Sequence, residues 1–328
     1  MTTAMPAQEA TPIRAIVLIL IGMVCISIND TLIKLLSGDY PLHQMVFIRS
    51  LIGIVITCGF VWGEGGWHLL KTDRPGLHVF RASLIVAANM LYFAALSVMP
   101  LGVATSLFFV APLFITLLAI PVLGEAVGRH RLIALLIGFA GVAVMMVPAT
   151  DWADVPRPAL FLPIAAAACY AGMQVMTRKL GAGSAASAMA IYIQAAFIVV
   201  SGVSFLAVGH GRYAEGLDSE SLIFLLRAWV WPASADIWKF ATLGAMSASI
   251  GYCLSAAYRI GNAATVASYE YVALPMAIFL GWVIFGERPG WVMVLGTALI
   301  AGAGLYVFAR ERRRAGVGPA AERPIRRG

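Results

Sequence analysis

The sequence has 328 residues, of which 61% are hydrophobic and 12% are charged, and its net charge is +7. Soluble globular chains carry about 25% charged residues, so this composition excludes an ordinary water-soluble domain. The positive charge does not indicate nucleic-acid binding, because seven arginines lie in the last nineteen residues and no basic stripe crosses the body of the chain.

Apolar segments long enough to cross a bilayer follow one another along most of the chain. A membrane helix needs about 20 mainly apolar residues. We predict ten such helices, at 14–36, 42–62, 77–98, 101–122, 130–148, 158–177, 187–208, 237–257, 263–285 and 290–309. The fold class expected is therefore an all-α integral membrane protein. The long connection 209–236 carries enough apolar residues for a short interfacial helix.

The distribution of Lys and Arg predicts the orientation of these helices. With the N-terminus placed in the cytoplasm, sixteen Lys and Arg residues fall on the cytoplasmic side and five on the outer side. Cytoplasmic loops carry the excess of positive charge in membrane proteins. We therefore expect a multi-pass protein of the plasma membrane, in a bacterium the inner membrane, with residues 1–13 and the basic tail 310–328 both cytoplasmic.

The second half of the chain repeats features of the first half. A shift of 162 residues aligns Ser106 with Ser268 and the Gly-Glu pair 124–125 with 286–287, and a shift of 145 aligns Lys34 with Lys179. These matches predict two five-helix repeats, 14–148 and 158–309, joined by an outer linker at 149–157, with 209–236 as an outer loop of the second repeat. An odd number of helices per repeat makes the two repeats inverted, as in many secondary transporters.

The sequence also resembles the drug/metabolite transporter superfamily, in its EamA-type ten-helix branch. The resemblance rests on the small-residue segment 94–112, on the helix ends Leu-Gly-Glu (123–125) and Phe-Gly-Glu (285–287), and on Arg49 in the second helix. It implies a transporter of amino acids, vitamins such as riboflavin, S-adenosylmethionine or similar metabolites. Glu270 departs from the pattern of the family, in which a Glu directly precedes the Pro of the ninth helix; here that Pro is Pro275.

Polar side chains inside the predicted helices are the candidates for binding. A charge at the bilayer centre costs roughly 2.5–3.5 kcal/mol on insertion scales, so such residues are usually functional. The candidates for substrate or proton binding are Asp30, Arg49, Asn89, Tyr92, Gln174, Gln194, Tyr258 and Glu270.

Structural roles compete with binding at several of these positions. Asp30 and Arg49 lie at similar predicted depth, so they either neutralise each other or contact the solute. Lys34 is expected to extend to the outer interface, and Glu125 and Glu287 are expected to cap helix ends. Glu270 is the residue that we expect to bind the solute or a coupling proton, since a carboxyl group in a low-dielectric site can exchange protons near neutral pH. The alternative is that a Tyr hydroxyl or Arg49 holds it.

A secondary transporter of a small organic metabolite is the function that these features favour, with the solute bound near the midplane between the repeats. Helices 130–148 and 290–309 lack charges in their cores and suit support or homodimer contacts. The alternatives are a channel, a membrane scaffold without transport, and a membrane-embedded enzyme. No catalytic residue, metal site or cofactor is predicted; the partners expected are the solute, the lipid bilayer and a coupling proton or ion.

Overall fold

The computed structural model describes residues 13–72, 74–123, 129–145, 155–180, 185–260, 266 and 269–316. Within these ranges the regular structure is helical and contains no strand. The helices are α1 (Ile13–Leu36), α2 (Leu42–Glu64), η1 (Trp67–Leu70), α3 (Pro75–Leu96), α4 (Leu101–Phe108), α5 (Ala111–Leu123), α6 (Arg129–Met145), η3 (Arg157–Leu160), α7 (Phe161–Leu180), α8 (Ala186–Val208), η5 (Arg212–Ala214), α9 (Glu220–Leu226), η6 (Ser234–Asp236), α10 (Ile237–Ile260), α12 (Ala273–Phe285) and α13 (Trp291–Gly316).

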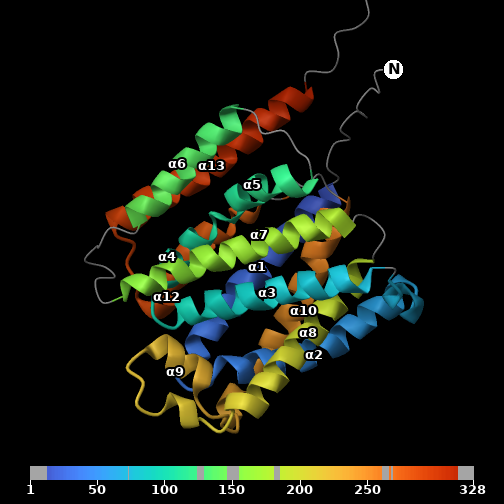
Figure 1. Ribbon diagram of the computed structural model, residues 1–328, viewed down its shortest axis with the longest axis vertical. Coiled ribbons are helices and arrows are strands. Elements are labelled where there is room, and N and C mark those ends of the chain that lie inside the picture. The colour runs from blue at the N-terminus through green and yellow to red at the C-terminus, as the bar shows by residue number, and fades with distance from the viewer. Residues whose placement is uncertain are drawn as a thin grey trace, which may run out of the picture.

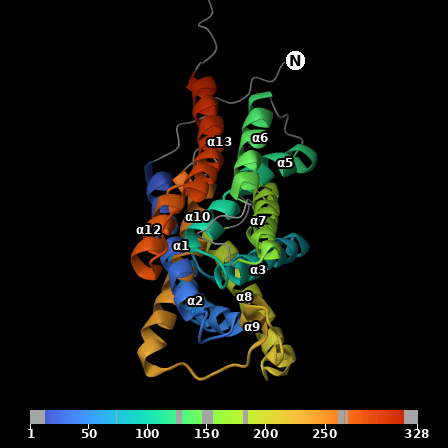
Figure 2. The ribbon, with the colours of Figure 1, turned by 90° about the vertical axis from the view of Figure 1, so that its left-hand side faces the viewer.

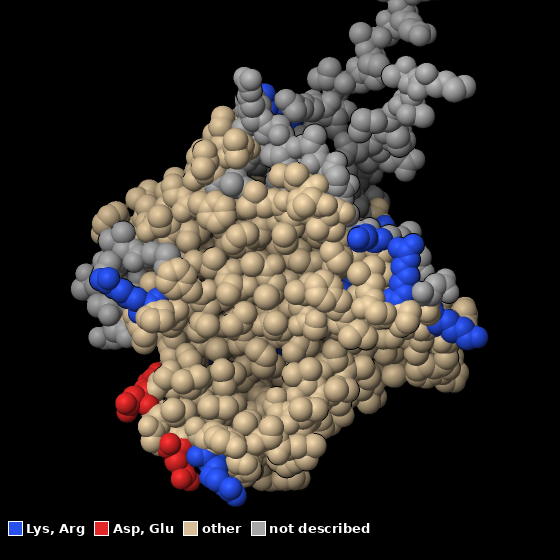
Figure 3. Space-filling model, viewed as in Figure 1, with Lys and Arg blue, Asp and Glu red and all other residues tan. Residues whose placement is uncertain are grey.

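The lengths and composition of these helices confirm a membrane protein. In the described part of the chain, seven helical segments are long and apolar enough to cross a bilayer, and shorter apolar helices lie at Leu132–Met145, Ala273–Phe285 and Trp291–Tyr306. The space-filling view shows Lys, Arg, Asp and Glu near the two ends of the helices, with a broad face of other residues between them (Figure 3). Such a face is suited to contact with lipid acyl chains.

The segment 101–122, predicted as one helix, is interrupted in the structure. α4 ends at Phe108 and α5 begins at Ala111. Pro112 lies in the first turn of α5, and proline is tolerated there because the amide that it lacks would have no partner inside the helix. A similar interruption precedes α12, where a turn hydrogen bond joins the Val272 amide to the Tyr269 carbonyl.

The long helices pack in extended pairs. α1 lies along α10, α3 along α7, α2 along α8, and α6 along α13. In Figures 1 and 2, α6 and α13 stand together at one edge of the bundle. Small residues allow the close approach that membrane helices need, and Gly22 of α1 faces the side chain of Leu254 on α10.

The connection 209–236 folds over the end of the bundle where α1 leads into α2. It contains the short helix α9, as predicted, and Phe224 of this helix is fully buried. Ser221 donates a hydrogen bond to the Ala94 carbonyl at 2.9 Å, and the Val230 amide donates to Gln44 Oε1 at 3.1 Å. These contacts fix the connection against α2 and α3 and cover that end of the helices.

Candidate solute-binding cavity

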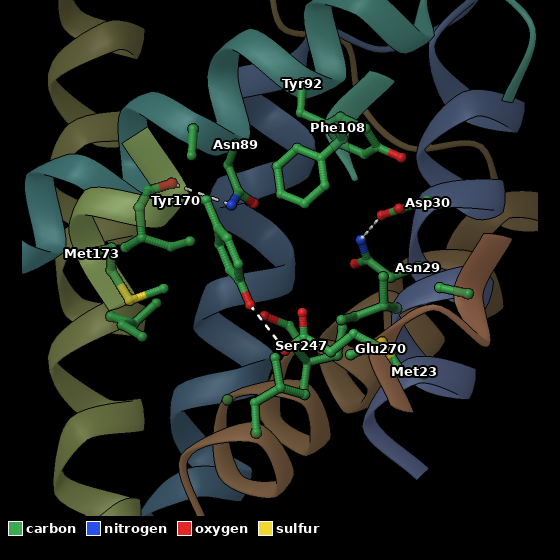
Figure 4. Close-up of a pocket in the computed structure, with 18 of the residues that line it drawn as sticks. Met23, Asn29, Asp30, Asn89, Tyr92, Phe108, Tyr170, Met173, Ser247 and Glu270 are labelled. Carbon is green, nitrogen blue, oxygen red and sulfur yellow. Dashed lines mark hydrogen bonds between the residues drawn. The ribbon is translucent and has the colours of Figure 1, made fainter. Parts of the chain in front are cut away.

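A cavity of about 190 Å³ lies inside the helix bundle. The cavity is lined by residues of α1, α2, α3, α4, α7, α8, α10 and α12 and of the segment just before α12, so both halves of the chain contribute to it. None of its lining residues in the described ranges comes from α6 or α13. Figure 4 shows several of the polar and aromatic side chains that point toward this space.

The eight residues predicted to bind substrate or proton all line this one cavity. They are Asp30, Arg49, Asn89, Tyr92, Gln174, Gln194, Tyr258 and Glu270. They come from six helices and from the segment before α12, so the fold gathers side chains that lie up to 240 residues apart in the sequence. Their participation in binding remains a prediction.

Arg49 is held firmly at one side of the cavity. Its guanidinium donates to Asn29 Oδ1 at 3.1 Å and to Asn89 Oδ1 at 2.9 Å. The rings of Phe93 and Phe197 lie 5.2 and 5.1 Å from it, within the range of a cation–π interaction. Arg49 is only 3% exposed, so these neutral partners replace water around its charge.

Asp30 and Arg49, which we expected either to neutralise each other or to contact the solute, are linked through Asn29. Asn29 lies between them: its Oδ1 accepts from Arg49, and its Nδ2 donates to Asp30 Oδ1 at 3.1 Å (Figure 4). Asn29 directly precedes Asp30 on α1, and its amide carries both an acceptor and a donor. The two charges therefore interact through a bridging amide.

Glu270 lies in the cavity without a cationic partner in the described part of the chain. Its Oε1 accepts hydrogen bonds from the hydroxyls of Tyr258 and Tyr170, the latter at 3.4 Å (Figure 4). Gln174 donates to the Tyr170 hydroxyl at 2.7 Å and extends the network along α7. A tyrosine partner for Glu270 was one of the two alternatives that the sequence left open.

The remaining predicted residues are held by short polar contacts. The Tyr92 hydroxyl lies 2.9 Å from Thr105 Oγ1 on α4, and Gln194 Nε2 donates to Ser247 Oγ at 3.0 Å. Phe108 lies between two tyrosines, with ring centroids 5.1 Å from Tyr92 and 5.3 Å from Tyr170. The cavity thus combines polar groups with an aromatic wall that suits a planar ring or an organic cation.

Sequence reasoning missed five polar residues that line the cavity: Asn29, Arg81, Thr105, Tyr170 and Thr177. Tyr170 and Thr177 lie on α7 among small and apolar residues, and Arg81 was counted only as a positive charge at the cytoplasmic end of a helix. Their spacing in the sequence could have revealed two of them. Tyr170, Gln174 and Thr177 are spaced by four and three residues, which places them on one helix face. Arg81 lies in the second turn of α3, too deep to belong to a loop.

Lys34, which we expected to extend to the outer interface, is paired with a carboxylate. Its Nζ lies 2.9 Å from Glu287 Oε1, and it also donates to the backbone carbonyl of Met99. Its side chain is only 14% exposed. Glu287, which we expected to cap a helix end, accepts a hydrogen bond through its Oε2 from the Leu101 amide at the start of another helix, α4. Glu125 lies outside the described residues.

Comparison with known proteins agrees with this architecture. The EamA-like transporter family matches residues 13–147. The chain is a multi-pass membrane protein that carries an EamA-like transporter domain. This EamA-like domain supplies Asp30, Arg49, Asn89 and Tyr92 to the cavity, and the other four predicted residues come from the rest of the chain.

Curated relatives of this EamA-domain protein cover most of its length. A riboflavin transporter of Brucella anthropi is 28% identical over 83% of this chain and 89% of its own. An S-adenosylmethionine uptake transporter of Rickettsia prowazekii is 27% identical over 92% of this chain and 95% of its own. The pseudopaline exporter CntI of Pseudomonas aeruginosa is 26% identical over 84% of this chain and 88% of its own. A solved crystal structure with 20% identity and a TM-score of 0.65 covers 91% of this chain and 98% of its own, and shares the fold.

Proposed function

We propose that this protein is a secondary transporter that moves a small organic metabolite by alternating access and binds it in the central cavity. The observation that carries the proposal is the placement of this cavity. It lies in an apolar bundle, it collects sixteen polar or charged side chains, and both the first and second halves of the chain line it. A polar site between two halves near the midplane is typical of secondary transporters.

The helix pairing supports ten membrane helices in two inverted five-helix repeats, 14–148 and 158–309. In such a repeat α7 is the counterpart of α1, and α10 is the counterpart of α3. The packing of α1 on α10 and of α3 on α7 is then the same contact made twice. The pairs α2 with α8 and α6 with α13 each join a helix to its own counterpart.

The helix interruptions support the same repeat. α5 begins at Ala111 and α12 begins at Ala273, and these two alanines are related by the shift of 162 residues found in the sequence. Broken helices beside a binding site are common in transporters built from inverted repeats, because the irregular backbone lies against a cavity rather than lipid.

The orientation that we propose places both termini in the cytoplasm of the plasma membrane, the inner membrane in a bacterium. It rests on the sixteen Lys and Arg residues on that side against five on the other. In this orientation Lys34, Glu287 and the connection 209–236 lie at the outer end. Their contacts close that end, and Arg81 and Thr177 line the cavity toward the cytoplasm. This arrangement supports an inward-facing state.

The chemistry of the cavity supports an organic solute with an aromatic or cationic part. Riboflavin and S-adenosyl compounds, named for the relatives, both contain planar heteroaromatic rings, which Tyr92, Phe108 and Tyr170 can stack against. The carboxylates of Glu270 and Asp30, which both line the cavity, supply acceptors for a cation or a coupling proton. In the described residues no cluster of His, Cys, Asp and Glu is arranged to hold a metal ion.

Uptake into proteoliposomes tests the proposal. Purified protein is reconstituted and labelled riboflavin, S-adenosylmethionine and an amino-acid mixture are added outside, with and without a proton gradient; protein-free vesicles are the control. We expect accumulation of at least one compound that saturates with concentration and is inhibited by its unlabelled form. Flux that rises linearly with concentration would favour the channel alternative. Absence of uptake for the whole panel would contradict these substrate classes.

A further inference from the structure

Arg81 is a buried cation whose charge has no acidic partner in the described part of the chain. It lies in the second turn of α3, lines the cavity and is 3% exposed. Its Nε donates to Thr177 Oγ1 at 2.6 Å, and Nη1 is buried with no acceptor. A buried charge that lacks both a counter-ion and a full set of hydrogen bonds is costly.

The other buried cations of the bundle are better satisfied. Lys34 forms an ion pair with Glu287, and Arg49 has two amide acceptors and two aromatic rings. Arg81 meets only one hydroxyl acceptor among the described residues, and its burial keeps it away from lipid headgroups. The anion that would satisfy its guanidinium is therefore expected inside the cavity.

The geometry of the guanidinium indicates the kind of anion. With Nε already bound to Thr177, the edge formed by the two Nη groups is the remaining donor pair. Such a pair matches the two oxygens of a carboxylate, and arginine is suited to this bidentate recognition.

Polar groups on α7 connect this position to Glu270. Thr177 contacts Arg81, and Gln174 bonds Tyr170, which bonds Glu270. From Tyr170 to Thr177 the helix rises about 10 Å. The cavity thus presents a cation at one end of this polar face and a carboxylate at the other.

We propose that Arg81 binds a carboxylate group of the transported solute. The inference rests on the proposed function and narrows its substrate class to organic compounds that carry a carboxylate, with a cationic or ring portion directed toward Glu270. An S-adenosyl amino acid has this chemistry. Riboflavin, which has no carboxylate, does not.

Ligand binding to the purified protein in detergent tests the assignment without depending on transport. The probes are S-adenosylmethionine, its decarboxylated analogue and riboflavin, measured by isothermal titration calorimetry. The first two differ only in the carboxylate. The variants are Arg81→Gln, Arg81→Lys and the matched control Arg74→Gln, which removes an exposed charge at the start of the same helix.

We expect the wild-type protein to bind S-adenosylmethionine roughly ten- to a hundredfold more tightly than the decarboxylated analogue, as expected for hydrogen bonds to a charged group. Arg81→Gln should abolish this preference, Arg81→Lys should reduce it, and Arg74→Gln should preserve it. If Arg81→Gln does not fold, as judged by size-exclusion chromatography, the reduction in Arg81→Lys decides the question.

Two results would overturn the assignment while leaving a transporter in place: equal binding of the two S-adenosyl probes by the wild-type protein, or an unchanged preference in the Arg81 variants. Binding of riboflavin alone would also overturn it. If no probe binds and none is taken up by proteoliposomes, the proposed function with these substrate classes fails, and the role of Arg81 fails with it.

Discussion

Lys34 and Glu287 join parts of the chain that are about 250 residues apart. Lys34 Nζ lies 2.9 Å from Glu287 Oε1, and Oε2 of the same carboxylate accepts a hydrogen bond from the Leu101 amide at 2.8 Å. One carboxylate therefore connects the end of α1, the chain after α12 and the first amide of α4. A carboxylate also interacts favourably with the positive end of a helix dipole.

We expect this pair to contribute measurably to folding. Because the two side chains are only 14% and 19% exposed, removing one partner leaves a poorly solvated charge. A double-mutant cycle with Lys34→Met and Glu287→Gln should give a coupling free energy of about 1–3 kcal/mol. The measurement is unfolding in mixed micelles as the SDS fraction rises.

The ion pair between Lys239 and Asp236 is the control for this cycle. It joins residues three apart in sequence, with its Nζ and Oδ1 at 2.6 Å. A pair three residues apart, whose lysine is 26% exposed, should show a coupling of about 0.5 kcal/mol. Equal coupling in the two pairs would mean that Lys34 and Glu287 add nothing beyond a local ion pair.

Asn29 should contribute to the stability of the helix bundle as much as the two charged residues that it joins. Asn29→Ala removes an acceptor from Arg49 and a donor from Asp30, so we expect it to lower the free energy of unfolding by about 1–3 kcal/mol. In an Arg49→Gln background the same substitution should cost less, since the buried charge is gone. Ser204→Ala, which removes a bond to its own helix on an exposed face, should have little effect. Additive effects of Asn29→Ala and Arg49→Gln would contradict the bridge.

The contact between α6 and α13 depends on close backbone approach. A Cβ added at Gly141 would lie 2.9 Å from the Gly296 carbonyl oxygen, whereas one at Gly302 would meet nothing within 4 Å. Gly141→Ala should therefore destabilise the protein by about 1–3 kcal/mol through overpacking, and Gly302→Ala should be neutral. Thermal unfolding of both variants in the same detergent compares them. An equal loss at the two positions would show that the packing is not the cause.

The polar residues that line the cavity could largely be predicted from the sequence. Polar side chains are costly in a bilayer, so their presence in apolar helices marks a functional interior, and eight such residues share one cavity. The partners of each side chain could not be predicted. The bridge by Asn29 depends on how α1, α2 and α3 rotate about their axes, which hydropathy does not record.

Other features depended on contacts between distant segments. Lys34 lies near the predicted end of its helix, where lysine usually reaches water, and its ion pair with Glu287 depends on a segment about 250 residues away. Arg81 was overlooked because the count of positive charges treats every Arg near a helix end alike. The interruption at 109–110 could have been anticipated from Pro112, although proline within the first turn of a helix leaves the exact start open.

The orientation of the chain gives a further prediction. Reporter fusions at Gly183 and Gly316 should both report the cytoplasm, and a fusion at Gly211 should report the exterior, because positive charge is concentrated on the side of the first two. A cytoplasmic report at Gly211 would contradict both the two inverted repeats and the assignment of Lys34 and Glu287 to the outer end.

Transport by the Glu270→Gln variant is the measurement that tests the binding site most directly. The substitution keeps the shape of the side chain and removes its charge and its titration, and Glu220→Gln on α9, remote from the cavity, is the matched control. Proteoliposome uptake of the solute identified by the uptake panel is measured across a range of pH. We predict that Glu270→Gln folds normally but loses uptake, or its dependence on pH, while Glu220→Gln retains both. Full uptake with an unchanged pH profile in Glu270→Gln would contradict a solute- or proton-binding role for the central carboxylate.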